Sequence, residues 1–225
     1  MNVIIPIGGT GQRFKEENYH LPKPLINVLG KPMIYRVINS LELNTDDNII
    51  IIYNNHLKDL NFESLIKFYF PNKNIKFITL DHLTKGAAET VLMGLNEMSL
   101  KELNNEYLLI DCDTFYEEDI ISLYKESQYK NAIFYSHNTD TNPIFSYINT
   151  QKNEKIIEIK EKNKISDKAN TGAYGFENGH LLKKYCKKIL NNTGEPYISH
   201  VYNEMLKENI EIYGIKIDKF NCVGT

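Results

Sequence analysis

Three glycines and two cations near the start of the chain have the types and spacing of a phosphate-binding loop. Gly8, Gly9 and Gly11 follow directly after the first apolar run, and glycine lets backbone N–H groups approach phosphate oxygens closely. Arg13 adds a forked cation, and Lys23 adds a second one held between two prolines. A glycine turn followed by a solvated polar loop is the alternative interpretation, but the downstream lysine favours a site for the phosphates of a nucleotide.

Two better-known nucleotide loops do not fit this pattern. A dinucleotide-binding Rossmann turn needs GxGxxG, and Arg13 stands where the third glycine would be if Gly8 were the first. It also needs an acidic residue after the second strand, where this chain has Tyr53-Asn54-Asn55. A Walker loop needs Gly-Lys-Ser/Thr after the glycines, and none follows. We therefore expect a different kind of nucleotide loop.

Asp111 and Asp113 form a second group with chemical potential, directly after a buried apolar run. The carboxyl ends of parallel strands are where open α/β sheets place their ligands, and strand alternation sends both side chains the same way. Hard carboxylate oxygens suit Mg²⁺, which binds few protein ligands together with substrate phosphates. An Asp-rich turn without a metal is the alternative.

A stretch of small residues, Thr84 to Thr90, comes where a strand is expected to turn into a helix. Its small side chains would let a flat nucleobase lie against the backbone. A helix start capped by Thr84 would look the same. The candidate base contacts are Thr84, Gly86, Ala87 and Ala88.

The elements that must position these residues alternate between short β-branched runs and longer amphipathic ones. We predict strands at 2–7, 48–53, 75–80, 107–111, 131–136, 144–149, 155–160, 172–176 and 211–217. We predict helices at 32–43, 57–69, 86–98, 117–128, 178–190 and 197–208. The fold class is therefore α/β, with a mixed, mainly parallel central sheet between helices in a Rossmann-like three-layer α/β/α arrangement.

Bulk properties limit the classes of function. The 225 residues, 42% of them hydrophobic, fit one domain over 1–225, and the final residues 221–225 are consistent with a domain cut short there. A net charge of -3 lacks the basic excess of a nucleic-acid binder. Three widely spaced cysteines without a CxxC pattern, together with the lack of a signal peptide or membrane-spanning run, favour a cytoplasmic protein without a membrane partner.

The segments Ile5–Phe14, Pro22–Leu25 and Gly30–Ile34 together resemble the signature of the sugar nucleotidyltransferase family, which has a GT-A-like fold. This resemblance implies that Ile7, Thr10, the glycine loop and Arg13 bind the NTP, and that Arg13 and Lys23 act in catalysis. It also implies base and ribose contacts from the 84–90 stretch, which is most similar to family members that use CTP. Asp113 is the stronger metal ligand candidate, with Asp111 beside the nucleotide.

The same resemblance indicates an acceptor side. Residues binding the acceptor would be Lys162, Asn170, Thr171, Gly172 and Tyr174, although Lys162 lies in a charge run of the kind that is often only solvated. The segment 195–199 opens a helix and either closes over the pocket or serves only as a cap and staple.

One departure concerns the second metal ligand of the family, an Asp three residues before a Thr near the end of the domain. This chain has Cys222 at that position, and a thiol is a poor Mg²⁺ ligand. Either Asn221 or Asp218 replaces it, or the site uses fewer protein ligands.

The resulting expectation is an enzyme that transfers a nucleoside monophosphate, CMP from CTP, onto a small phosphorylated acceptor with Mg²⁺ and releases pyrophosphate. Its acceptor would be a sugar 1-phosphate or, by resemblance to a subgroup of capsular phosphoramidate biosynthesis, phosphoglutamine. Two alternatives remain open: a glycosyltransferase that uses Asp111 and Asp113 as a DxD metal site, and a non-catalytic nucleotide-binding regulator. The expected partners are small molecules, and a homodimer is one option for the assembly.

Overall fold

The apolar runs of the N-terminal half form the centre of one mixed sheet. The structure, a computed structural model, describes residues 1–9 and 11–224, with Arg13 described through its backbone alone. Strands β1 (Asn2–Ile7), β4 (Asn48–Asn54), β5 (Ile75–Leu80) and β6 (Tyr107–Ile110) are parallel, and β1 lies between β4 and β6. Their carboxyl ends therefore meet at one edge of the sheet.

The second half of the chain adds strands of mixed direction. β11 (Lys168–Phe176) pairs antiparallel with β6 and carries the sheet onward to β9 (Ser146–Thr150) and β10 (Ile156–Glu161). β8 (Ala132–His137) also pairs with β11, and β12 (Tyr213–Lys216) pairs with β8. The order along the main path is β10-β9-β11-β6-β1-β4-β5.

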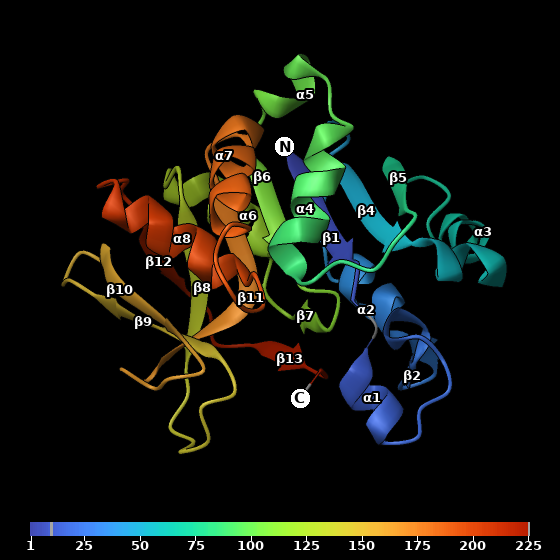
Figure 1. Cartoon of the computed structure of the whole chain (residues 1–225), viewed down its shortest axis with the longest axis horizontal. Helices are drawn as coiled ribbons and strands as arrows, with labels where there is room; N and C mark the ends of the chain where they lie inside the picture. The colour runs from blue at the N-terminus through green and yellow to red at the C-terminus, as the bar shows by residue number, and fades with distance from the viewer. Residues whose placement is uncertain (10, 225) are drawn as a thin grey trace.

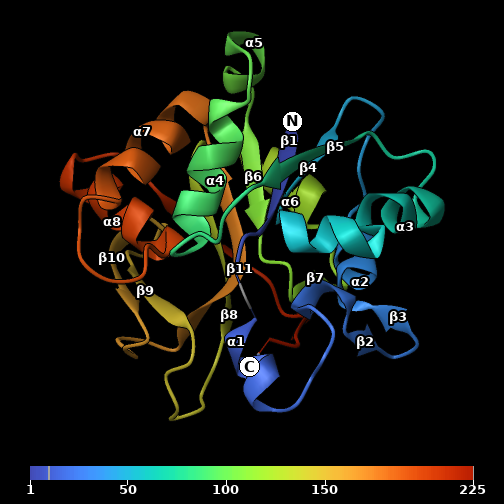
Figure 2. The same cartoon turned by 45° about the vertical axis from the view of Figure 1, so that its right-hand side comes forward.

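Helices cover both faces of this sheet (Figures 1 and 2). One core cluster packs α4 (Ala87–Asn96), α7 (Gly179–Ile189) and α8 (Ile198–Lys207) against the first face. The other packs α2 (Met33–Asn39), α3 (Phe62–Tyr69) and α6 (Ile120–Ser127) against the second. None of the helices within the described ranges has the length and apolar character to cross a bilayer.

The central strands read as unbroken apolar runs because both of their faces are covered. In β4, Ile50 and Ile52 belong to the first cluster, whereas Ile49, Ile51 and Tyr53 belong to the second. Side chains alternate between faces along a strand, so each face receives its own set. These layers confirm the predicted mixed, mainly parallel α/β/α architecture.

Several short elements were not predicted from the sequence. They are too short to show a periodic pattern, since each has two to five residues: α1 (Gln12–Glu16), the 3-10 helix η1 (Lys23–Leu25), β2 (Asn27–Val28), β3 (Lys31–Pro32), α5 (Leu100–Leu103), β7 (Thr114–Tyr116) and β13 (Phe220–Cys222). β13 pairs with β7, which brings residues near the end of the chain beside those that follow β6.

Three predicted elements differ most from the observed ones. The helix predicted at 57–69 is divided into the 3-10 helix η2 (Asn55–Leu60) and α3, because Asn61 between them adopts a left-handed conformation with φ of 54°. The helix predicted at 32–43 ends at Asn39, and the strand predicted at 172–176 begins four residues earlier, at Lys168. The longer β11 places Asn170 and Thr171 inside a strand rather than in a loop.

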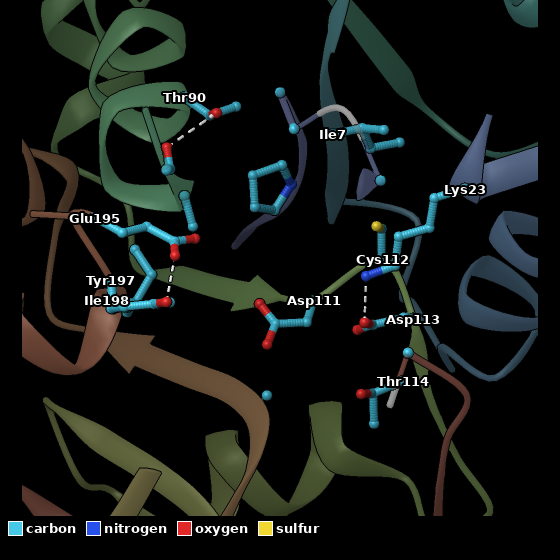
Figure 3. A pocket seen from close by; sticks show the side chains of 18 of the residues that line it. Ile7, Lys23, Thr90, Asp111, Cys112, Asp113, Thr114, Glu195, Tyr197 and Ile198 are labelled. Carbon is cyan, nitrogen blue, oxygen red and sulfur yellow. Dashed lines mark hydrogen bonds and ion pairs between the residues drawn. The ribbon is translucent and has the colours of Figure 1, made fainter. Parts of the chain in front are cut away.

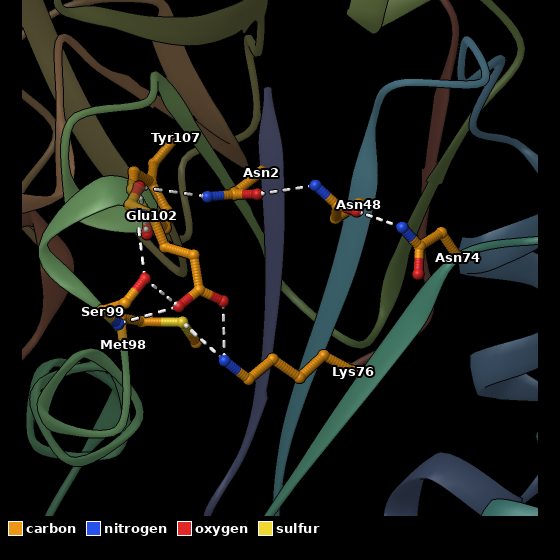
Figure 4. A network of polar contacts seen from close by, with 8 residues as sticks. All are labelled: Asn2, Asn48, Asn74, Lys76, Met98, Ser99, Glu102 and Tyr107. Carbon is orange, nitrogen blue, oxygen red and sulfur yellow. Dashed lines mark hydrogen bonds and ion pairs between the residues drawn. The ribbon is translucent and has the colours of Figure 1, made fainter.

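A polar network closes the amino-terminal edge of the sheet (Figure 4). Asn48 donates a hydrogen bond of 3.1 Å to Asn2, and Asn74 donates one to Asn48, so a side-chain ladder crosses β1, β4 and the start of β5. Lys76 donates to Glu102 at 2.7 Å. Hydrogen bonds from Lys76 and from the cap of α5 lower the pKa of Glu102 to about 2. The polar side chains at this edge therefore use one another as hydrogen-bond partners.

Candidate active site

A cavity of about 520 Å³ lies at the opposite edge, where β1 and β6 end and β11 passes. Most of the residues predicted to bind nucleotide, metal or acceptor line it together. They are Ile7, Gly8, Gly9, Gly11, Lys23, Thr84, Gly86, Ala87, Asp111, Asp113, Lys162, Asn170, Thr171, Gly172 and Tyr174. Segments more than 150 residues apart in the sequence therefore meet in one cavity.

Three residues that were predicted to bind the nucleotide are not in this list, for two different reasons. Ala88 was expected to contact the base, but its side chain is fully buried in the core between α4 and the sheet. Its place one residue into α4 turns the side chain inward, and its N–H donates to the Pro196 carbonyl at 3.0 Å. Thr10 and the side chain of Arg13 lie outside the described part of the chain.

The glycine loop begins in close contact with the start of α4. The hydroxyls of Thr84 and Thr90 lie 2.6 Å apart, and a Cβ built on Gly8 would collide with both of them. Only glycine lets the chain leave β1 this close to α4. The phosphate-loop candidate and the base-binding candidate are thus in direct contact.

Lys23 and Asp113 form an ion pair on the side of the cavity away from α4 (Figure 3). The side chains of Lys23 and Asp113 are 25% and 16% exposed, so water screens the pair only in part. Burial by itself would lower the pKa of Lys23, but the neighbouring Cys112, Asp113 and Asp111 raise it above its ordinary value. Lys23 therefore carries a positive charge at neutral pH.

Asp111 points into the middle of the cavity (Figure 3). Burial, and then the charge of Asp113 and that of Glu161, raise its pKa above the ordinary carboxyl value, while Lys23 acts in the opposite direction. Its backbone N–H donates to the Gly172 carbonyl at 2.8 Å, which ties the end of β6 to β11. A cation entering the cavity would offset the cost of ionising Asp111.

The wall of the cavity that holds the acceptor candidates also contains charged side chains that interact with one another. Lys162 donates to the Tyr197 hydroxyl at 2.7 Å, and that hydroxyl donates to Glu195. Glu161 accepts a hydrogen bond of 2.7 Å from Ser199, which is 1% exposed at the start of α8. Glu161, Lys162, Glu195 and Tyr197 all line the cavity.

The cavity is also lined by residues outside the predicted site. Thr90, the last residue of the 84–90 stretch, lies one helical turn after Gly86 and lines the cavity with it. The segment 195–199 supplies Glu195, Tyr197 and Ile198 to the cavity, so it is more than a helix cap. Nothing in the sequence alone indicated Phe145 and Ser146, which reach the cavity from the start of β9.

The possible metal donors are few. Within residues 1–9 and 11–224, no group of three or more His, Cys, Asp and Glu side chains is placed to hold a metal ion. Asp111 and Asp113 offer hard carboxylate oxygens beside the glycine loop, which fits Mg²⁺ because that ion takes few protein ligands in addition to phosphates.

The two proposed substitutes for the missing family carboxylate do not line the cavity. Asp218 has a side chain that is 71% exposed and pairs with Lys216 at 3.0 Å. Asn221 donates to Glu117 at 3.1 Å. Cys222 and Gly224 do line the cavity, and a Cβ on Gly224 would collide with the Asp113 carboxylate. The end of the described chain therefore packs directly against the metal candidate.

The comparison with known families assigns the chain to one class of protein. The family model described as nucleotidyl transferase matches residues 2–225, so the chain belongs to the nucleotidyl transferase family. This match confirms the resemblance inferred from the glycine loop and from the lysine between two prolines.

Curated relatives match all or most of this chain but extend further. The chain is 28% identical over 227 residues to the bifunctional protein GlmU of Methanococcus aeolicus, covering 100% of this chain and 51% of that protein. It is 25% identical over 228 residues to the bifunctional protein GlmU of Aquifex aeolicus, covering 94% of this chain and 47% of the relative. The chain spans about half the length of the curated relatives it matches.

Solved structures share the fold over nearly the full chain. A nucleoside-diphosphate-sugar pyrophosphorylase from Vibrio cholerae RC9 has a TM-score of 0.83 at 22% identity, covering 99% of this chain and 96% of that one. The inositol-1-phosphate CTP transferase from T. maritima has a TM-score of 0.77 at 14% identity, covering 100% and 89%. At these identities the likeness concerns the fold.

Proposed function

We propose that this chain is a nucleotidyltransferase that moves a nucleoside monophosphate from an NTP onto a small phosphorylated acceptor and releases pyrophosphate. The observation that carries the proposal is the pairing of Lys23 with Asp113 in the cavity that the glycine loop also lines. A cation for phosphates and a carboxylate for a metal thus lie together at the carboxyl edge of the sheet. Membership of the nucleotidyl transferase family supports this function.

In the proposed reaction an ionised oxygen of the acceptor phosphate attacks the α-phosphorus of the NTP in line. A bond forms between this oxygen and the α-phosphorus, the bond from the α-phosphorus to the bridging oxygen breaks, and pyrophosphate leaves with the bond electrons. No general base is needed because the acceptor phosphate is already ionised. The role of Lys23 is to neutralise the charge on the reacting phosphates, for which its raised pKa keeps it protonated.

Mg²⁺ is the proposed cofactor, held by Asp113 with Asp111 nearby. When bound it would supply charge neutralisation on the triphosphate. The chain's own contribution is to position the substrates: the glycine loop faces the phosphates, and the 84–87 segment offers small residues to the base. Because Cys222 takes the place of a carboxylate, the site would rely on few protein ligands.

For the substrates we propose CTP and, as acceptor, phosphoglutamine, with a sugar 1-phosphate as the other option. The acceptor wall carries Glu161 and Glu195 beside Lys162, so it presents both signs of charge. An acceptor with an ammonium and a carboxylate, such as phosphoglutamine, complements this wall better than an uncharged sugar ring does. Such a product would serve capsular polysaccharide biosynthesis, in a pathway of the phosphoramidate type.

The test is a pyrophosphate-release assay on the purified chain with Mg²⁺, each of the four common NTPs, and phosphoglutamine, glucose 1-phosphate or glucosamine 1-phosphate as acceptor. We expect the fastest release with CTP and phosphoglutamine. An Asp113→Ala variant serves as the control for a contaminating activity. Absence of pyrophosphate with every pair would contradict the proposal, and consumption of a nucleotide-sugar without pyrophosphate would instead identify a glycosyltransferase that uses the two aspartates as a DxD site.

A further inference from the structure

Asn54, the last residue of β4, lies directly behind the glycine loop without lining the cavity. The parallel register pairs Ile7 with Tyr53, so the next residue of each strand, Gly8 and Asn54, continues side by side. The Asn54 side chain donates from Nδ2 to the Gly8 carbonyl, and the residue is 2% exposed. Gly8 is therefore held from two sides, by Asn54 at its carbonyl and by the hydroxyls of Thr84 and Thr90 at its Cα.

The side-chain oxygen of Asn54 makes this residue unusual. Its Oδ1 is buried and has no hydrogen-bond partner among the described residues. A buried amide oxygen without a partner is destabilising, and an apolar side chain of the same size would remove that cost. The apolar side chain would also leave the buried Gly8 carbonyl without its donor, so the two effects roughly cancel. Stability therefore gives asparagine little advantage here, whereas the need for a donor at the Gly8 carbonyl favours it.

The orientation of the peptide group between Gly8 and Gly9 explains what the Nδ2 donor of Asn54 does. A trans peptide unit is planar, with its C=O and the following N–H pointing in opposite directions. Because Asn54 holds the Gly8 carbonyl toward the end of β4, the N–H of Gly9 in the same plane points away from β4. Gly9 is exposed on the cavity wall, and glycine on both sides of this peptide leaves it free to rotate unless it is held.

We infer that Asn54 is a positioning residue for the nucleotide: by holding the Gly8 carbonyl, it orients the Gly9 N–H toward the NTP phosphates. This inference rests on the proposed function. It predicts that loss of the Nδ2 donor weakens NTP binding specifically, because the N–H donor of the loop is no longer oriented before the ligand arrives. Binding of the acceptor, which contacts the opposite wall, does not depend on Asn54.

The test compares Asn54→Leu with wild type by calorimetric titration with a non-hydrolysable CTP analogue and Mg²⁺, and by KM values for both substrates. Leucine has the branched shape of asparagine, with methyl groups in place of Oδ1 and Nδ2, so it removes both the donor and the unpaired acceptor. We expect about tenfold weaker binding of the analogue, a higher KM for CTP and an unchanged KM for the acceptor. The melting temperature should change little, because an unpaired Gly8 carbonyl replaces the unpaired Oδ1 of Asn54. A merely structural role would lower the melting temperature together with both affinities.

A matched control is Asn131→Leu. Asn131 is also buried, at 3% exposure, but it bonds to the backbone of Glu177 and Glu211 and does not line the cavity. There the same substitution is expected to lower the melting temperature and leave the affinity for the analogue unchanged.

The outcomes separate the two proposals. Wild-type affinity in a folded Asn54→Leu protein would overturn the positioning role alone. Equal losses in CTP and acceptor affinity together with a lower melting temperature would also overturn it, in favour of a structural role. If the wild-type chain did not bind the CTP analogue and released no pyrophosphate with any NTP, the proposed function would fall and the role of Asn54 with it.

Discussion

Lys23 and Asp113 carry opposite charges inside a cavity, where their interaction is stronger than at an open surface. The sequence predicted both as functional residues because a lysine between prolines and a carboxylate after a buried strand are recognisable patterns. Their direct contact was not predictable, since it depends on how residues 90 positions apart are brought together. The position of Tyr197 in the cavity wall was not predictable either, because it depends on contacts with Lys162 and Glu195.

At this scale we predict that Lys23→Ala and Asp113→Ala each reduce turnover more than they reduce nucleotide affinity. Charge on the phosphates is greatest in the transition state, so loss of a neutralising group should cost about a hundredfold in kcat. Steady-state pyrophosphate release and direct CTP titration measure the two effects separately.

The matched control for Lys23 is Lys76→Ala, because Lys76 also pairs with a carboxylate but lies at the other edge of the sheet. It should leave kcat unchanged. Turnover at the wild-type rate in Lys23→Ala would remove Lys23 from the mechanism.

Strand β11 positions several residues of the cavity together. The sequence predicted a strand at 172–176, but the observed strand starts at Lys168, because 168–171 lack an apolar alternation that would mark them. This extension carries Asn170 and Thr171 along the cavity. Gly172 then adopts φ of +85° inside the strand, and the residue is held close to Asp111. Periodic patterns indicate where strands run, but not where a strand bends around a site.

We predict that Gly172→Ala impairs the site through this element. The left-handed conformation costs a non-glycine residue about 1 to 2 kcal/mol, and the added Cβ would lie 2.8 Å from the Asp111 carboxylate oxygen. Displacing Asp111 should lower kcat by about tenfold or more, since small shifts in a catalytic site are costly.

The Gly30→Ala variant separates the effect of backbone strain from the effect of displacing Asp111. Gly30 has nearly the same φ, +83°, and a Cβ there would meet nothing within 4 Å. Thermal unfolding should show a loss of stability in both variants, with an additional loss in Gly172→Ala from the close contact with Asp111. Pyrophosphate release should fall only in Gly172→Ala. Equal activity in the two proteins would show that the position of Asp111 does not depend on Gly172.

Across the whole molecule the two edges of the sheet differ in how their polar groups are satisfied. At the amino edge, asparagines, Lys76 and Glu102 bond to one another (Figure 4). At the carboxyl edge, Asp111 and the glycine loop face an open cavity (Figure 3). The sequence predicted the layers of the fold well because long amphipathic and apolar runs dominate packing energetics. It predicted neither the hydrogen bonds of the amino edge nor the Lys23–Asp113 contact at the carboxyl edge, since polar side chains pair according to their placement in the folded chain.

Asp47 links three parts of the amino edge and gives a prediction for the stability of the whole chain. It is 4% exposed, and its carboxylate accepts hydrogen bonds from Lys125 on α6 at 2.7 Å and from the Asn44 N–H at 3.0 Å. Burial by itself would raise the pKa of Asp47, but the bonds from Lys125, Asn44 and the chain's amino group hold it below the ordinary value. The folded state therefore favours the ionised form more than the unfolded state does.

Because the folded pKa is the lower one, the stabilisation is complete above the unfolded-state pKa, near 4, and is lost as the pH falls through the folded value. We predict that Asp47→Asn lowers the free energy of unfolding by about 2 kcal/mol at pH 7, since it removes hydrogen bonds to a charged group. The difference from wild type should shrink steadily below about pH 4. Urea titrations at several pH values measure it, with the exposed neighbour Asp46→Asn as the control. A difference that stays constant from pH 7 to pH 3 would show that the charge of Asp47 does not stabilise this edge.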